Sequence, residues 1–291
     1  MELLYNPFSL SGKVILVTGA ASGIGRATAI ECSKMGASVI ITDIRENGLT
    51  ETLHLLCGEN REHRMITCDL TEDADLERMV SLLPMLDGMV NNAGITKPLP
   101  VKFINRGDIE KILSVNALAP IYLTQKLLKK KKLKKGASLV FTVSIGGVYT
   151  VAPGNAMYGV SKGALHVFMK NAALELASTG IRCNSVNPGM VDTNLVAGKQ
   201  YSQDDRERDM KTYPMKRYGE PREVALGIVY LLSDASSFVT GHTLIIDGGK
   251  LCIKDGKIIT WQGLYCYGSR SRNWEGNRGA FCRRWRYCLC F

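Results

Sequence analysis

Residues 13–25 read KVILVTGAASGIG, and this stretch decides the fold. Its first part, KVILVT at 13–18, is apolar and rich in β-branched residues, which is typical of a buried strand. Its second part places glycines at 19, 23 and 25, where an amphipathic segment at 23–35 is predicted to form a helix. The stretch therefore predicts a strand, a glycine-rich turn and a helix in direct succession.

The same alternation continues along the chain to residue 249. Further strands are predicted at 38–43, 64–69, 87–92, 138–143, 181–187 and 243–249, and helices at 46–57, 74–83, 107–131, 156–178 and 221–233. Continuous apolar strands separated by helices favour a parallel sheet that is covered on both faces. The predicted fold class is α/β, a doubly wound parallel sheet of the Rossmann-like, three-layer α/β/α type in a single domain.

Composition marks a boundary near residue 250. The 291 residues are 45% hydrophobic and 22% charged, which excludes a disordered chain and a small disulfide scaffold. Residues 251–291 hold eight of the 37 basic residues, two of the 27 acidic ones, all three Trp and five of the nine Cys. We therefore expect residues 1–250 to form the α/β domain and residues 251–291 a basic, Cys/Trp/Arg-rich tail that is not an independent domain.

The sequence also bears on location and on the tail. No run of 18 apolar residues and no basic start followed by an apolar stretch is present, so we expect a cytoplasmic protein with reduced thiols and no membrane contact. Arg interleaved with Trp and Tyr in the tail could bind nucleic acid, but a disordered extension is favoured. The tail has no His, and its Cys spacing fits no common zinc site, so no metal is expected.

The glycine turn predicts a site for the phosphates of a dinucleotide. Gly19 permits a tight turn, while Gly23 and Gly25 let the backbone approach a pyrophosphate at a helix N-terminus, whose dipole favours an anion. Asp43, at the end of the next strand, can accept hydrogen bonds from the ribose hydroxyls and would repel a 2′-phosphate. With the neutral Ser22 in the loop, this favours NAD over NADP, although Arg45 could offset the preference.

Several motifs then resemble the short-chain dehydrogenase/reductases of the single-domain type. The motifs are TGAASGIG (18–25), NNAG (91–94), Asn116, Ser144, YGVSK (158–162) and NPGMVDT (187–193). With the segments 217–234 and 236–249, the resemblance covers roughly residues 8–250 and is greatest to 3-oxoacyl carrier-protein reductases and to sugar or alcohol dehydrogenases. It implies an NAD(P)-dependent oxidoreductase that interconverts a secondary alcohol and a ketone, assembled as a homotetramer.

The resemblance also implies the site residues. Tyr158 matches the catalytic acid/base, Lys162 the lysine that lowers its pKa and contacts the nicotinamide ribose, Ser144 the serine that polarises the substrate carbonyl, and Asn116 the asparagine that holds a proton-relay water. The cofactor-binding positions that it implies are Gly19, Ser22, Gly23, Ile24, Gly25, Asp43, Asp69, Leu70, Asn92, Ala93, Gly94, Tyr158, Lys162, Pro188, Gly189, Val191 and Thr193.

The chemistry of Tyr158 and Lys162 follows from their spacing. The two residues are four apart and hence neighbours on one helix face. An ammonium ~4 Å from a phenolate is worth on the order of 4 kcal/mol at an effective dielectric near 20. This corresponds to about three pKa units, which would bring the phenol into the working range of an acid/base.

One spacing departs from the family pattern. Ser144 lies 14 residues before Tyr158, where the family usually has 13, and Val143 replaces the first serine of a common pair. A one-residue insertion between Gly146 and Pro153 would absorb the difference. Without it, Ile145 would occupy the place of the serine.

Residues 126–135, KLLKKKKLKK, offer a further candidate surface. They are predicted to be the solvated end of a long helix, where lysines are favoured by the dipole. The alternative is a docking patch for an acyl carrier protein, which would suit an NADPH-dependent 3-oxoacyl carrier-protein reductase. A rival of another class is a non-catalytic protein that senses a dinucleotide or binds nucleic acid through its basic tail.

Overall fold

A computed structural model gives the fold and describes residues 5–58, 61–193, 203–254 and 257–258. Seven strands form one parallel sheet in the order β3-β2-β1-β4-β5-β6-β7, which confirms the predicted doubly wound arrangement. The strands are β1 (Val14–Thr18), β2 (Ser38–Asp43), β3 (Arg64–Thr67), β4 (Leu86–Asn91), β5 (Leu133–Thr142), β6 (Arg182–Pro188) and β7 (Thr243–Ile246).

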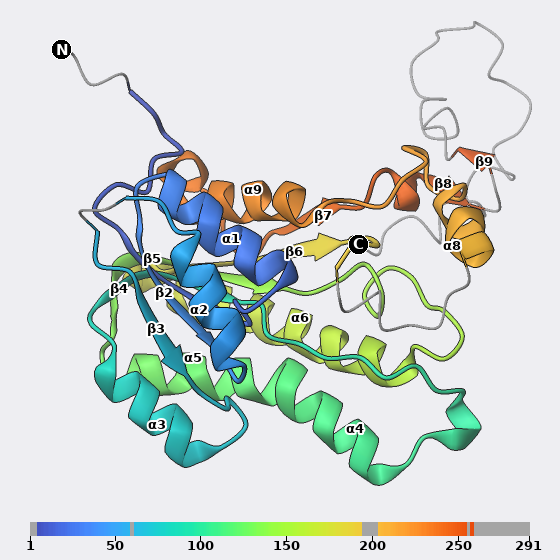
Figure 1. The fold of residues 1–291 in the computed structure, drawn as a ribbon, viewed down its shortest axis with the longest axis horizontal. Coiled ribbons are helices and arrows are strands. Elements are labelled where there is room, and N and C mark those ends of the chain that lie inside the picture. The colour runs from blue at the N-terminus through green and yellow to red at the C-terminus, as the bar shows by residue number, and fades with distance from the viewer. Residues whose placement is uncertain (1–4, 59–60, 194–202, 255–256, 259–291) are drawn as a thin grey trace, which may run out of the picture. The chain divides into compact units, whose positions relative to one another are not determined.

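Helices cover both faces of this sheet (Figure 1). The helices on one face are α1 (Gly23–Lys34), α2 (Glu46–His54) and α9 (Pro221–Leu232), and those on the other are α3 (Asp73–Leu82), α4 (Arg106–Leu113), α5 (Ala119–Lys129) and α6 (Ala156–Leu176). A further helix, α8 (Gln203–Met210), lies between β6 and α9 in the chain. Short 3-10 turns occur at Val101–Phe103, Ala177–Thr179, Asp234–Ser236 and Lys250–Cys252.

Two apolar cores hold the layers together because side chains alternate along each strand. Leu16 of β1 points to the face where α3, α5 and α6 pack. Its neighbours Ile15 and Val17 point to the opposite face, where they meet α1 and α9. Strands with both faces buried must be apolar throughout, which is why they read as continuous apolar runs in the sequence.

Several element boundaries differ from the predictions, and three of these differences bear on the site or on the lysine-rich segment. The strand predicted at 243–249 ends at Ile246, because Gly248 and Gly249 adopt the left-handed backbone of a turn. The helix predicted at 107–131 contains a π turn at Ser114–Leu118 and ends at Lys129. The last part of the lysine-rich segment 126–135 is therefore not a helix end, since β5 already begins at Leu133.

Contacts along the chain define two compact units, Met1–Leu251 and Cys252–Phe291. In the second unit, the short strands β8 (Ile253–Lys254) and β9 (Lys257–Ile258) pair antiparallel. The Arg-, Trp- and Cys-rich part of the predicted tail lies outside the described residues. No helix in the described part of the chain is long and apolar enough to cross a membrane.

Candidate active site

The carboxyl ends of the parallel strands open into one large cavity. Its volume is about 1400 Å³, and the residues that line it follow β1, β2, β3, β4, β5 and β6. The sheet order reverses between β1 and β4, which is where doubly wound sheets hold their ligands. The cavity exceeds the usual size of a drug-sized site and so has room for an extended dinucleotide beside a small substrate.

Glycines shape the turn between β1 and α1. Gly19 has a φ of +65°, and a Cβ placed on it would lie 2.7 Å from the Cα of Ala93. A Cβ on Gly25 would lie only 2.1 Å from the Gly19 carbonyl oxygen. Ser22 is the N-cap of α1, but its side chain makes no cap hydrogen bond, and the first turn holds no acidic residue. The turn thus fits the pyrophosphate of a dinucleotide, since no acidic side chain in the first turn of α1 competes for the amides at the helix start.

Asp43, the last residue of β2, lines the end of the cavity that the sequence assigns to the adenosine, and it already has protein partners. Its carboxylate accepts hydrogen bonds from the Ala21 amide (3.2 Å) and from Arg45 Nε (3.2 Å). The Arg45 guanidinium also donates to Ser22 Oγ at 3.0 Å, so it bridges the two residues from which the sequence infers cofactor preference. The Asp43 carboxylate is nearly buried, whereas the Arg45 guanidinium is about half exposed. A ligand at this end of the cavity would therefore meet a cation as well as an anion.

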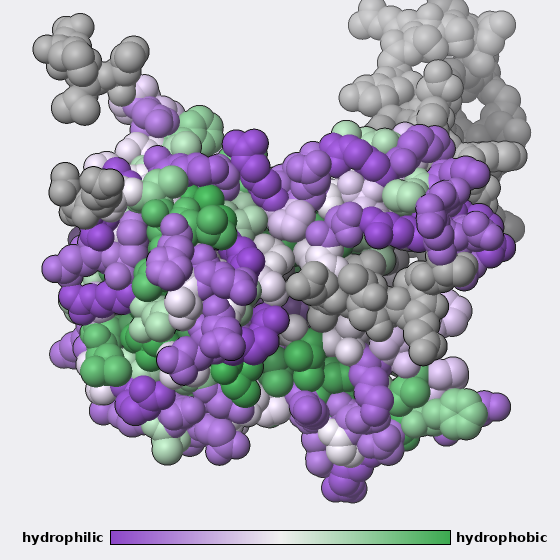
Figure 2. Space-filling view, in the orientation of Figure 1, coloured by the Kyte–Doolittle hydropathy of each residue, from purple (hydrophilic) through white to green (hydrophobic). Residues whose placement is uncertain are grey.

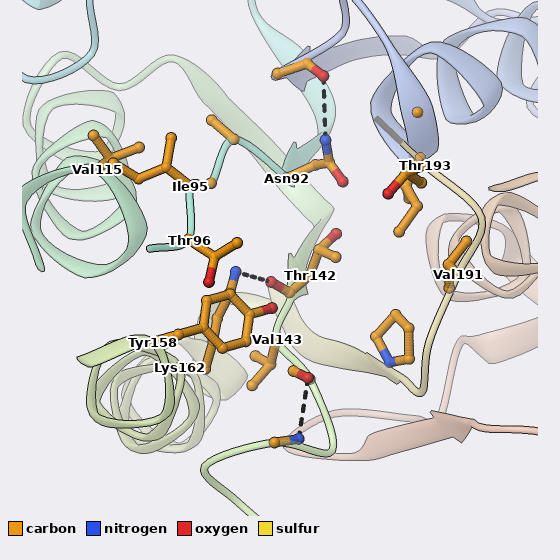
Figure 3. A pocket seen from close by; sticks show the side chains of 18 of the residues that line it. Asn92, Ile95, Thr96, Val115, Thr142, Val143, Tyr158, Lys162, Val191 and Thr193 are labelled. Carbon is orange, nitrogen blue, oxygen red and sulfur yellow. Dashed lines mark hydrogen bonds between the residues drawn. The ribbon is translucent and has the colours of Figure 1, made fainter. Parts of the chain in front are cut away.

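Tyr158 and Lys162 project from one face of α6 toward the end of β5 (Figure 3). Lys162 is buried, and its Nζ donates to the Thr142 carbonyl oxygen at 2.8 Å while lying 5.7 Å from the centre of the Tyr158 ring. Burial lowers the pKa of Lys162 to about 8. At neutral pH this side chain is therefore still an ammonium.

The pKa of Tyr158 differs from the prediction. Burial raises it above the ordinary value, and only the hydrogen bond with Ser144 acts in the opposite sense. The Lys162 ammonium is directed to the Thr142 carbonyl rather than to the phenolic oxygen, so it is not among the causes of this shift, and its lowering of the Tyr158 pKa stays a prediction. Tyr158 thus stands as a protonated phenol, ready to donate a proton.

Ser144, and not Ile145, reaches the tyrosine. The Ser144 side chain lies close enough to Tyr158 to lower its pKa, and its Oγ accepts a hydrogen bond from the Gly146 amide at 3.0 Å. The amides of Tyr149 and Thr150 both donate to the Ile145 carbonyl, which folds the following residues into a tight turn. The turn in the loop before α6 therefore accommodates the one extra residue between Ser144 and Tyr158.

Asn116 lies in the π turn and is fully buried. Its Oδ1 accepts the Ile95 amide at 2.8 Å, and its Nδ2 donates to the Ile95 carbonyl (2.9 Å) and to Ser161 Oγ (3.0 Å). Both hydrogens of the amide are thus engaged, so a relay water could meet only Oδ1 or the main chain of this residue.

Nearly all the residues singled out from the sequence line this one cavity. Asn92 and Thr193 face it from the opposite side to Tyr158 (Figure 3). The two that do not line it are Asn116 and Gly25, which lie behind its wall. Residues that the sequence reasoning missed include Cys68, Thr96, Lys111, Val115, Thr142, Asp209, Tyr213 and Lys250. Val115 and Thr142 lie within two residues of Asn116 and Ser144, so these motif positions could have indicated them. Asp209 and Tyr213 belong to no motif in the sequence.

Comparisons with known proteins agree with this geometry. A family model described as enoyl-(acyl carrier protein) reductase matches residues 19–250. A 3-oxoacyl-[acyl-carrier-protein] reductase from Thermotoga maritima is 35% identical over 244 residues, covering 82% of this chain and 98% of the relative.

Solved structures show the same fold. A putative gluconate dehydrogenase from Agrobacterium tumefaciens superimposes with a TM-score of 0.81 at 25% identity, covering 86% of this chain and all of that one. A putative NAD(P)-dependent gluconate 5-dehydrogenase from Beutenbergia cavernae with bound NADP has a TM-score of 0.79 at 28% identity, covering 85% and 100%. The chain therefore belongs to the short-chain dehydrogenase/reductase family and is an NAD(P)-dependent oxidoreductase that interconverts alcohols and ketones.

Proposed function

We propose that Tyr158 is the general acid/base of this reaction, with Ser144, Lys162 and Asn116 completing the catalytic set. The observation that carries the proposal is the convergence of Ser144, Tyr158 and Lys162 in one wall of the cavity: Ser144 is close enough to lower the pKa of Tyr158, and the Lys162 ammonium lies 5.7 Å from the centre of the tyrosine ring. A hydroxyl, a phenol and a cation meet there at the carboxyl end of β5, in the wall of the large cavity.

The groups act in sequence on a ketone oxygen. Ser144 donates a hydrogen bond that orients the carbonyl and stabilises the charge that develops on its oxygen. Tyr158 delivers its proton to that oxygen, and the Lys162 ammonium stabilises the phenolate that remains. When bound, the dinucleotide supplies the hydride, and it accepts one in the reverse direction. Gly19, Ser22, Gly23 and Ile24 would hold its pyrophosphate, and Lys162 its nicotinamide ribose.

Asn116 contributes by fixing the groups around the catalytic pair. Its amide ties the Ile95 backbone to Ser161, which lies one position before Lys162 on α6. A relay water would then bind at Oδ1 or at the carbonyls of the π turn.

Replacement of Tyr158 by Phe tests the assignment. The variant keeps the ring but loses the proton, so we expect ketone reduction to fall by about 10²–10⁴-fold while NADH affinity stays the same. Steady-state rates and nicotinamide fluorescence titrations measure the two quantities. Turnover that stays near wild type in this variant would exclude Tyr158 as the acid/base.

We also propose that the chain prefers NAD over NADP but retains use of NADP. Asp43 supports NAD, because its carboxylate would repel a 2′-phosphate. Arg45 weakens the preference, since its half-exposed guanidinium pairs with Asp43 and could turn to an added phosphate. Rates with NADH and NADPH, compared between wild type and Asp43→Asn, test this. A gain for NADPH of about tenfold is expected, and a wild-type preference for NADPH would overturn the proposal.

A 3-oxoacyl carrier-protein reductase remains the second candidate, because the family model and the Thermotoga relative carry acyl carrier protein in their descriptions. The lysine-rich segment 126–135 gives it little support as a docking patch. Lys126 and Lys130 pair with Glu77, Lys134 pairs with Asp87, and β5 begins in this segment, at the far end from Ser144. NADPH-dependent reduction of 3-oxoacyl thioesters that is faster with the carrier protein than without it would favour this candidate.

A further inference from the structure

The cavity is lined by a lysine, Lys250, that has no role in the proposed reaction. Lys250 follows β7 and lines the cavity together with Tyr213 and Met190. The Tyr213 side chain is buried, and its hydroxyl accepts the Met190 amide at 3.2 Å. Lys250 Nζ lies 4.6 Å from the centre of the Tyr213 ring. Tyr213, in the segment between β6 and α9, thus packs against the Lys250 side chain, which follows β7.

This places Lys250 on the substrate side rather than the adenosine side. The loop after β6 is joined to the Ser144 region, since the Ile145 amide donates to the Pro188 carbonyl at 3.1 Å. A Cβ on Gly189 would lie 3.3 Å from Tyr213 Cε1, so this ring packs directly behind the loop. Asp43, which marks the adenosine end, follows β2, four strands away from β6 in the sheet.

Within the described part of the chain, the Lys250 ammonium contacts two neutral side chains. It is held over the Tyr213 ring, and it donates to Thr212 Oγ1. None of the ion pairs among the described residues includes Lys250. A half-buried cation with neutral neighbours attracts an anion more strongly than one in open solvent, because screening is weaker.

The other charges at this end are already occupied. Asp209 accepts the Tyr218 hydroxyl at 2.8 Å, and Arg206 pairs with Asp192 at 2.6 Å. Much of the wall between Ser144 and α6 is apolar, formed by Ile145, Val151, Ala152 and Pro153. The surface of α8, in contrast, is hydrophilic (Figure 2). The cavity therefore combines the catalytic pair, an apolar wall and, beside Tyr213, a cation that none of the ion pairs among the described residues includes.

We propose that Lys250 binds a carboxylate of the substrate that is remote from the reacting carbonyl, so that the substrate is an oxo acid or a hydroxy acid. A carboxylate suits the site because a single ammonium matches one negative charge better than the double charge of a phosphate. The carboxylate is unchanged in the reaction, in which carbon gains a hydride and oxygen gains a proton from Tyr158. The inference rests on the proposed function, since it takes the carbonyl to be held by Ser144 and Tyr158.

Matched substrates test this assignment. A series of oxo acids of increasing chain length is compared with the methyl esters of the same acids, which keep the carbonyl and lose the charge. We expect wild type to reduce at least one acid about tenfold more efficiently, in kcat/KM, than its ester. Lys250→Met should abolish this preference by raising KM for the acid, with the ester unaffected. Lys250→Arg should keep it.

A second lysine serves as the matched control. Lys211 is exposed, lies two residues before Tyr213 and does not line the cavity. Lys211→Met should therefore leave the preference for the acid over its ester intact. The midpoint of thermal unfolding, measured for each variant with NADH present, should rise with the favoured acid in wild type and in Lys211→Met but not in Lys250→Met. This readout does not depend on turnover.

The outcomes separate the two proposals. Equal rates on acid and ester in wild type, or an acid preference that survives in Lys250→Met, would overturn the role of Lys250 and leave the proposed catalysis intact. A phosphate ester preferred over the acid would also overturn it. Failure of wild type to reduce any ketone with either dinucleotide would remove both proposals together.

Discussion

Single residues set the pH range of the site, and Lys162 is the clearest case. Burial lowers its pKa from 10.5 to about 8, so the unfolded chain binds more protons than the folded one between these two values. The contribution of Lys162 to stability therefore rises as the pH increases through this window, because the cost of burying a charge disappears. Cofactor affinity should change in the opposite direction and fall as the pH rises, since the protonated form of Lys162 is the one expected to hold the nicotinamide ribose.

We expect the affinity for NADH to fall as the pH rises above about 8, by at most tenfold per pH unit, because Lys162 loses the proton that lets it act as a cation. Nicotinamide fluorescence titrations between neutral and alkaline pH measure the effect. Tyr158→Phe should show the same profile, since its missing hydroxyl is not the titrating group. An affinity that is flat across this range would contradict the assignment of Lys162.

The contact between a loop and a helix decides whether Ser144 reaches Tyr158. Gly147 has a φ of +87°, and a Cβ on it would lie 2.2 Å from the Gly159 carbonyl oxygen at the start of α6. Gly163, one turn further along, faces the Gly147 carbonyl, where a Cβ would lie at 3.2 Å. The absence of side chains at these points allows the loop that carries Ser144 to lie directly on the helix that carries Tyr158.

Gly147→Ala should therefore separate the two catalytic hydroxyls. We expect kcat to fall by about tenfold or more, because the methyl group must displace the loop from α6, while NADH affinity changes little. Gly136→Ala is the matched control, since Gly136 also has a positive φ (+83°) but no atom within 4 Å of an added Cβ. Equal losses of kcat in the two variants would mean that backbone strain, and not the loop–helix contact, is responsible.

At the scale of the whole molecule, the surface of the long helices indicates assembly. Large apolar side chains are exposed on α5 and α6, among them Tyr122, Val160, Val167 and Leu174, the last with 81% of its surface accessible. Isolated apolar side chains are common on protein surfaces, but several on adjacent helices favour a contact with another chain. We propose that copies of this chain meet at these helices to form the expected homotetramer.

Leu174→Glu tests that proposal. Burying a carboxylate without a partner in a subunit contact is costly, so we expect the variant to sediment as a smaller species than wild type. Analytical ultracentrifugation at matched concentrations gives the mass. Ile245→Glu, on the partly exposed β7, is a control of similar chemistry outside the two helices. A wild-type chain that sediments as a monomer would exclude the tetramer.

The sequence by itself determined the features that depend on near neighbours. Strand Val14–Thr18, the glycine turn and α1 follow from apolar runs, missing Cβ atoms and helix periodicity within one short stretch. The placing of Tyr158 and Lys162 on one face is likewise a consequence of helical spacing over four residues. Such patterns are visible in the sequence because the interacting groups are close along the chain.

Only the tertiary structure decided the contacts between distant residues. It brought Ser144 rather than Ile145 to Tyr158, directed Lys162 to the Thr142 carbonyl, and set Arg45 against both Asp43 and Ser22. It also placed Lys250 in the cavity. These contacts depend on how loops pack against helices and on which side chain lies within hydrogen-bond distance of a buried acceptor. The packing of the whole domain sets the distances between these groups.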